Sequence, residues 1–252
     1  MAFHLDGVLF KDTFGTKAMR RVFSEEGFID RFMAVEASLA RAEAAVGMIP
    51  ESAASTIVDT ASTGTLEPDI LEAKVDRLGL FSMAIIETWR DTIGEAGEYL
   101  HWGVSTQDIS DTAVVLQLRE AFAIIQDQIE TIGCSLAERS AEYRYTTMIG
   151  RTQFQAGPPV TLGLKLASWL DELTRHLVRL DDVTDRLFVV QLSGASGTMA
   201  ALGEESKAVR ERLAGDLNLG VPDTGWTASR DRFDEAVGLF ASIAGTLGRM
   251  AR

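Results

Sequence analysis

The sequence predicts an all-α fold, a bundle of long helices shared between the subunits of an oligomer. Its five prolines leave long proline-free stretches at residues 69–157, 160–221 and 223–252, and such stretches permit long helices. Apolar residues recur at alternating intervals of three and four positions, which is the spacing of packed helices. We find no convincing alternation of apolar and polar residues, so the sequence predicts essentially no β-sheet.

The strongest helices follow four apolar stripes. The first helix is expected to begin at Glu26 and to end near Gly47. The second is expected over about 108–146, where Asp108 can cap its first turn. Proline suits the first turn of a helix, so Pro158 and Pro159 are expected to open the third. The third reaches about residue 189, and the fourth runs from about 230 to the last residue.

Shorter elements are expected between these long helices. One helix is expected at about 81–96 and another at about 203–216. Residues 51–80 are weakly patterned, around a loop TASTGTLEPD, and a glycine-rich break SGASGT occupies 193–198. A helix over 108–146 would be roughly 58 Å long at about 1.5 Å per residue. An apolar seam of that length needs packing partners, so we expect the bundle to be shared between subunits.

Composition excludes several classes of function. The chain has 24 basic and 37 acidic residues and a net charge of −13, without the basic face that a nucleic-acid binder needs. No segment approaches the roughly 18 apolar residues of a membrane span, and the first 17 residues do not read as a secretory signal. The single cysteine, Cys134, is expected in a helix core and precludes an intrachain disulfide, which fits the cytoplasm.

Three polar segments between the helices offer the chemistry of an anion site. They are HWGVSTQDISDT at 101–112, GRTQFQAGPPVT at 150–161 and GWTASRDR at 225–232. Hydroxyl, amide and guanidinium groups beside helix N-termini can receive a carboxylate. Each segment also reads as an ordinary helix cap with surface arginines. The candidate substrate-binding residues are Ser105, Thr106, Gln107, Asp108, Arg151, Thr152, Gln153, Gln155 and Arg230, and His101 is the candidate catalytic residue.

In this order the motifs HWGxSTQDxxDT, RTxxQxxPPVTxG, GASGT and WxxSRDR resemble those of the fumarase/aspartase superfamily of lyases. The early segment VFSEEGFIDRFMAVEASLARAEAAVGMIP resembles the opening helix of the bacterial 3-carboxy-cis,cis-muconate cycloisomerases within it. The resemblance covers residues 8–252. It implies an N-terminal helical domain, 1–107, and a long-helix domain, 108–252, whose C-terminal part is absent. It also implies a homotetramer whose active sites combine loops of three subunits.

The implied reaction is addition or elimination across a bond next to a carboxylate. In the cycloisomerase branch, one carboxylate of 3-carboxymuconate, or of an analogue such as 3-sulfomuconate, adds to a double bond of the same molecule and gives a lactone in aromatic-compound degradation. The resemblance implies a di- or tricarboxylate substrate and no metal or organic cofactor. It also implies a proton-transferring serine in a later loop, GSSxMPxKxN, which has no match in this chain.

Two positions depart from the family patterns. Gln153 stands where adenylosuccinate lyases carry a histidine that acts as a general acid, and where cycloisomerases tend to carry tryptophan. Thr227 stands where cycloisomerases tend to carry histidine. A lyase like adenylosuccinate lyase, or a non-catalytic helical oligomer derived from the superfamily, therefore stays open as an alternative.

Overall fold

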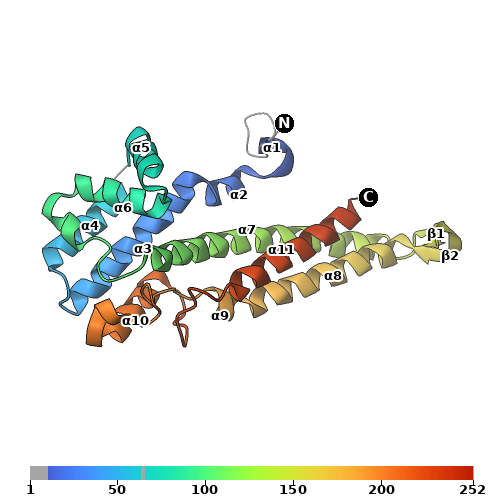
Figure 1. Cartoon of the computed structure of the whole chain (residues 1–252). Coiled ribbons are helices and arrows are strands. Elements are labelled where there is room, and N and C mark those ends of the chain that lie inside the picture. Colours follow the sequence, from blue (N-terminus) through green and yellow to red (C-terminus); the bar gives the residue numbers. More distant parts are fainter. Residues whose placement is uncertain (1–10, 64–65, 252) are drawn as a thin grey trace. The chain divides into compact units, whose positions relative to one another are not determined.

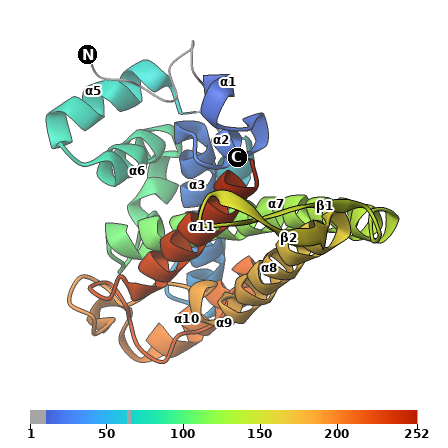
Figure 2. The same ribbon diagram turned by 90° about the vertical axis from the view of Figure 1, so that its right-hand side faces the viewer.

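A computed structural model describes residues 11–63 and 66–251, shown in Figures 1 and 2. Helices form almost all of its regular structure, which confirms the predicted all-α fold class. By packing, the described residues divide into two compact units. The first unit comprises residues up to 120 together with 188–230, and the second comprises 121–187 together with the residues from 231 onward.

This division differs from the expected domains 1–107 and 108–252. The helix α7 (Thr106–Glu142) begins in the first unit and continues into the second. Residues 188–230 return to the first unit, where Val190, Leu192, Val209 and Leu213 join its hydrophobic core. A boundary drawn at a single sequence position cannot represent a unit made from two separate segments.

The first unit is organised around one long helix, α3 (Glu25–Ala45). The hydroxyl of Ser24 caps it by accepting the Gly27 N–H at 3.0 Å. Helix α3 packs against α4 and α10, while α5 packs against α6. The other helices of this unit are α1 (Lys11–Phe14), α2 (Lys17–Val22), α4 (Glu51–Thr63), α5 (Pro68–Leu78), α6 (Phe81–Thr92), η1 (Gly94–Tyr99), η2 (Ala200–Glu205) and α10 (Ser206–Leu217).

The core of the first unit joins α3 to α6 and the start of α7. Phe32 and Leu39 of α3, Ile85 and Trp89 of α6, and Ile109 of α7 are all essentially inaccessible to solvent. Burying a side chain of this size stabilises the fold by about 1.5–3 kcal/mol. This core holds the N-terminal end of α7, where the first polar motif lies.

Helices α4 and α5 lie where the weak apolar pattern predicted no helix. The local signals are nevertheless present, because Pro68 opens α5 and Gly79 ends it in the left-handed conformation at φ 65°. Helix α4 is held from the side by the Trp89 indole, whose Nε1 donates to the Thr60 hydroxyl at 3.0 Å. Packing on α3 and α6 stabilises these short helices.

The second unit contains the remainder of α7 with α8 (Leu162–Asp182), α9 (Thr184–Leu187) and α11 (Asp231–Met250). The rings of Phe122 and Phe240 lie 5.1 Å apart, and this contact joins α7 to α11. Between α8 and α11, Nε2 of the buried His176 lies 2.9 Å from the Thr246 hydroxyl. Burial lowers the pKa of His176, so this histidine is a packed residue of the bundle.

A β-hairpin between α7 and α8 overturns two expectations. Strands β1 (Thr147–Thr152) and β2 (Gln155–Thr161) pair antiparallel, at the end of the α7–α8 pair in Figure 1. The predicted absence of sheet is therefore wrong here. The Pro158–Pro159 pair lies within β2 and does not open a helix; α8 begins after Thr161, whose hydroxyl accepts the Leu164 N–H at 3.1 Å. A two-stranded ribbon leaves one edge of each strand unpaired, where proline is tolerated.

Several apolar side chains of the second unit remain exposed. Leu164 and Val178 of α8 are 62% and 56% exposed, and Val237 of α11 is 64% exposed. Cys134 of α7 is also exposed, which corrects its expected core position. Among the described helices, none is long and apolar enough to cross a membrane.

Candidate functional site

The first polar motif forms the loop that leads into α7. Thr106 is the first residue of the helix, and Ser105, just before it, accepts the Gln107 N–H through its hydroxyl at 3.3 Å. Ser105, Thr106 and Gln107 are all half-buried. The Thr106 N–H has no acceptor among the described residues. A helix N-terminus carries partial positive charge, so this end of α7 can receive an anion.

Asp108 anchors this loop from inside the protein. Its side chain is buried and accepts five hydrogen bonds, from the N–H groups of Ser105 (3.0 Å), Ser193 (3.0 Å) and Gly194 (2.9 Å), from Nε2 of Gln191 (3.1 Å) and from the Ser193 hydroxyl (3.5 Å). Both carboxylate oxygens are thereby occupied by the protein. Asp108 was predicted to contact the substrate, but its carboxylate has no surface open to solvent. It supports the loop instead.

The third polar motif lies beside the first. Arg230 donates two hydrogen bonds to Asp111, from Nη1 to Oδ2 at 2.7 Å and from Nη2 to Oδ1 at 2.9 Å. Nε2 of Gln107 donates to Oδ2 of Asp111 at 3.3 Å and to the Thr227 carbonyl at 2.9 Å. The first and third motifs therefore meet at one place on the first unit.

Sequence reasoning missed the residue that ties these loops together. Gln191 is fully buried; its Nε2 lies 2.5 Å from the Thr227 hydroxyl, and its carbonyl accepts the Trp226 N–H at 2.9 Å. The SGASGT segment, read as a break, supplies Ser193 and Gly194 to Asp108. A glutamine beside a glycine-rich segment carries no signal of its own, so only the folded chain reveals this link.

The second polar motif lies on the hairpin of the second unit. Arg151, Thr152, Gln153 and Gln155 are all exposed. Thr152 pairs with Gln155, which leaves a two-residue turn of Gln153 and Phe154 with positive φ at both positions. No hydrogen bond or ion pair joins Arg151 to another described side chain. Its charge is thus available to a ligand.

His101 is held by a buried acid. Nδ1 of His101 lies 2.5 Å from Oε1 of Glu36 on α3, and the two side chains are 9% and 1% exposed. Two turns further along α3, Glu43 is equally buried. Burial and, second, the charge of Glu36 raise the pKa of Glu43 to about 9. Glu43 is therefore a neutral acid near pH 7, whereas Glu36 has a partner for its charge.

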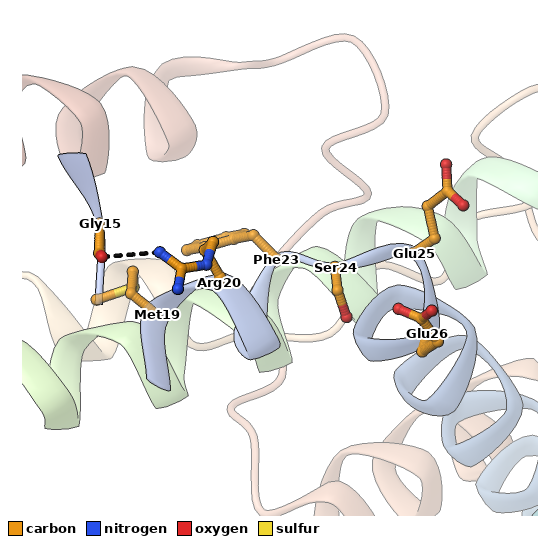
Figure 3. Close-up of a pocket in the computed structure, with 7 residues that line it drawn as sticks. All are labelled: Gly15, Met19, Arg20, Phe23, Ser24, Glu25 and Glu26. Carbon is orange, nitrogen blue, oxygen red and sulfur yellow. Dashed lines mark hydrogen bonds between the residues drawn. The ribbon is translucent and has the colours of Figure 1, made fainter. Parts of the chain in front are cut away.

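Two cavities lie away from these motif loops. One of about 580 Å³ lies between α2 and the start of α3, lined in part by Met19, Phe23 and Glu26, and Figure 3 shows Arg20 reaching across it to the Gly15 carbonyl at 2.8 Å. Another, of about 550 Å³, lies between α3, α5 and α6. Across residues 11–63 and 66–251, no group of three His, Cys, Asp or Glu side chains could hold a metal ion.

Comparison with known families gives one match, the family model described as Lyase, over residues 12–252. The chain is 41% identical over 99% of its length to N-acetyl-S-(2-succino)cysteine lyase of Dickeya dadantii, of which it covers 55%. It is 37% identical over 97% of its length to 3-carboxy-cis,cis-muconate cycloisomerase of Pseudomonas aeruginosa, of which it covers 54%. The chain thus spans about half the length of the curated relatives it matches.

Solved structures agree with the family match. The crystal structure of a fumarate lyase from Mesorhizobium sp. BNC1 superimposes with a TM-score of 0.89 at 44% identity. The match covers 92% of this chain and 55% of that chain. The predicted resemblance to this superfamily is confirmed in fold as well as in sequence.

Proposed function

Because this chain belongs to the lyase family of the fumarase/aspartase superfamily, we propose that the protein makes or breaks a bond at a carbon next to a carboxylate of a di- or tricarboxylate. The observation that carries the proposal is the meeting of the 105–108 and 226–230 loops at the N-terminus of α7. That end offers the Thr106 N–H and hydroxyl, and the Arg230 guanidinium lies in the same hydrogen-bonded cluster through Gln107 and Asp111. Local donors of this kind are required, because a net charge of −13 repels an anionic substrate at a distance.

The reaction we propose first is cyclisation of 3-carboxy-cis,cis-muconate or a close 3-substituted analogue such as 3-sulfomuconate. One carboxylate oxygen attacks a carbon of the double bond, and the electron pair of that bond moves to the neighbouring carbon. The adjoining carboxylate holds this charge as an aci-carboxylate until a proton is delivered to the carbon. The helix N-terminus and an arginine stabilise the developing charge without a cofactor.

A second candidate reaction is cleavage of an S-(2-succinyl) thioether. The 41% identity to N-acetyl-S-(2-succino)cysteine lyase favours it. A base removes a proton from the carbon next to one carboxylate, the same aci-carboxylate forms, and the electron pair then expels sulfur as a thiolate that takes up a proton. The products are an unsaturated dicarboxylate and a thiol. Gln153 stands where adenylosuccinate lyases carry a proton-transferring histidine, and an amide side chain cannot transfer a proton. The adenylosuccinate reaction is therefore the least favoured of the three.

In this proposal, Ser105, Thr106 and Gln107 receive one substrate carboxylate. Arg151, Thr152, Gln153 and Gln155 supply polar contacts from the hairpin of another subunit of a homotetramer. His101 exchanges a proton with the substrate or the leaving group. The serine that the resemblance places in a later loop has no match within these 252 residues. His101 is therefore the residue of this chain that we expect to carry a proton.

The test measures both reactions in the full-length protein. Loss of the muconate ultraviolet absorbance reports cyclisation, and release of free thiol reports thioether cleavage. Replacing Thr106→Ala should lower kcat/KM for the true substrate about 10- to 100-fold, because a lost bond to a charged group costs about 1.5–3 kcal/mol. Thr131→Ala, at an exposed position of the same helix, is the matched control. Cleavage of adenylosuccinate with neither other reaction would show that the wrong branch was chosen.

A further inference from the structure

The pair formed by Glu36 and His101 holds an imidazole in a defined orientation, four residues before Ser105 of the proposed site. Glu36 is 1% exposed, and its Oε1 lies 2.5 Å from Nδ1 of His101. Its other oxygen, Oε2, is buried and has no hydrogen-bond partner in the structure. A buried carboxylate is costly unless it is paired. The hydrogen bond to His101 is therefore the interaction that stabilises the charge of Glu36.

The backbone of His101 adds a second, independent observation. His101 has a φ of 61°, in the left-handed region that side chains other than glycine rarely adopt. The flanking loop is fixed, because Leu100 is buried and its carbonyl accepts Arg90 Nη2 at 2.7 Å. Gly103 lies so near the side chain of Leu202 that an added Cβ would come within 2.8 Å of it. A strained conformation that its surroundings impose is typical of functional positions.

This geometry has a chemical consequence for the ring. A neutral imidazole carries one N–H, and a carboxylate at Nδ1 favours the form in which Nδ1 carries it. Nε2 then holds the lone pair, and it has no hydrogen-bond partner among the described residues. When the ring takes up a proton at Nε2, the neighbouring carboxylate stabilises the positive charge.

We infer that Glu36 is a positioning residue that fixes His101 with its proton on Nδ1, so that Nε2 is the nitrogen that exchanges protons at the site. The catalytic part of this inference rests on the proposed function. The position of the proton on the His101 ring does not depend on it. Glu43 supports the arrangement, because it is neutral near pH 7 and places no second charge in this part of α3.

The test begins with the ring itself. The chain has three histidines, so the 15N signals of the imidazole of His101 can be assigned by comparison with a His101→Gln variant. The wild-type protein should show the proton on Nδ1, and this measurement needs neither a substrate nor a destabilising change. A wild-type ring with its proton on Nε2 would overturn the inference.

Three variants then separate positioning from general stability. Glu36→Met keeps the side-chain volume and removes the acceptor, so the proton should move away from Nδ1. Glu36→Gln keeps an acceptor oxygen, so it should retain the wild-type form of the ring. Glu43→Gln is the matched control, because Glu43 is as buried as Glu36 on the same helix, and it should leave the signals of His101 unchanged.

Turnover supplies the second measurement. Glu36→Met should lower kcat about 10- to 100-fold and change KM by less than about threefold, because general acid–base catalysis by a positioned group contributes factors of this size or larger. An unchanged ring together with an unchanged kcat in Glu36→Met would overturn the inference. If the wild-type protein converts none of the proposed substrates, the proposed function fails, while the 15N signals still decide the role of Glu36.

Discussion

Asp111 and Arg230 form a two-pronged ion pair, with Nη1 to Oδ2 at 2.7 Å and Nη2 to Oδ1 at 2.9 Å. Asp111 is 8% exposed and Arg230 is 40% exposed. The buried carboxylate therefore directs the guanidinium, while part of the guanidinium still reaches solvent. This geometry requires a planar group with two parallel N–H donors, which arginine supplies and lysine does not.

Arg230→Lys should therefore weaken substrate binding more than it weakens the fold. We expect KM to rise about tenfold, because lysine retains the charge but loses the paired hydrogen bonds. The free energy of unfolding should change by less than about 1 kcal/mol, since the pair is partly solvated. Arg230→Ala should cost about 1–3 kcal/mol, because it leaves the buried Asp111 without this partner.

Urea unfolding and steady-state kinetics check both effects. Adding Asp111→Asn to Arg230→Ala should recover part of the lost stability, because the buried charge is then removed as well. An unchanged KM in Arg230→Lys would exclude Arg230 from the substrate site.

Asp108 should matter to folding more than any exposed acid of the same helix. Asp108→Asn places an amide where five donors converge, so at least one donor loses its acceptor. We expect the free energy of unfolding to fall by about 3 kcal/mol. The control is Asp127→Asn, at an exposed position of α7, where the change should stay within about 0.5 kcal/mol. Equal small effects in both variants would show that the Asp108 network contributes little.

Local signals in the sequence predicted the position of α7 to within a few residues. Asp108 was predicted to cap a helix beginning at 108; the helix begins at Thr106 instead, so Asp108 lies within its first turn, where its carboxylate accepts the Ser105 N–H. The family resemblance named the 105–108 loop and Arg230 separately as substrate-binding, and the structure adds their connection through Gln107 and Asp111. No sequence spacing predicts this contact, because the two segments lie more than 100 residues apart.

Tertiary burial decided what the sequence could not predict. Glu36 follows Val35 in an apolar stripe and reads as a solvent-facing acid, yet it is buried against His101, 65 residues away. Pro158 and Pro159 fit a helix start as well as an unpaired strand edge, and strand pairing with Ile149 selected the strand. Gln191 gave no signal, because a single buried amide is recognisable only by its partners.

Glu43 should make the protein less stable as the pH rises. Its pKa is about 9 in the folded state and about 4.5 as a free group, so above pH 4.5 the unfolded chain loses a proton that the folded chain keeps. The stability associated with the neutral acid is complete below pH 4.5 and is lost progressively up to about pH 9. Glu43→Gln, a permanently neutral side chain of the same shape, should flatten this decline.

Urea unfolding at pH 5, 7 and 9 checks the effect. At pH 8 the Gln variant should be more stable than wild type by at least about 2 kcal/mol, since each unit of pKa shift corresponds to about 1.4 kcal/mol. Glu36→Gln serves as the comparison, because it removes the charge that Glu43 faces. It should also reduce the fall in the free energy of unfolding as the pH rises. A wild-type slope that Glu43→Gln leaves unaltered would show that other groups cause it.

The exposed apolar side chains of α8 and α11 should lie in subunit contacts of a homotetramer. Val178 and Val237 are 56% and 64% exposed, and interfaces between subunits that are permanently associated bury apolar side chains of this kind. Val178→Asp and Val237→Asp should each lower the mass measured by light scattering after size exclusion. Thr174→Asp, at an exposed polar position of α8, should leave the mass unchanged. A stable monomer in the wild-type protein would refute the shared bundle.

Replacing the two residues of the hairpin turn should raise the stability of the protein and lower its turnover. Gln153 and Phe154 have φ values of 46° and 65°, and the left-handed conformation costs a side-chain-bearing residue about 1–2 kcal/mol. Asn-Gly is the preferred pair in turns of this kind. The double replacement Gln153→Asn/Phe154→Gly should therefore raise the free energy of unfolding by about 1 kcal/mol or more. It removes no buried surface, because Phe154 is fully exposed.

The same double variant should lose about tenfold in turnover, because we propose that this hairpin holds part of the substrate in another subunit. Ala156→Ser, at an exposed position of β2 with ordinary backbone geometry, should change neither property. Stability is measured by urea unfolding and turnover by the muconate and thiol assays. Greater stability together with unchanged turnover would mean that the strained turn has no part in catalysis. Reduced turnover would show that the Gln153–Phe154 turn is retained for function at some expense of stability.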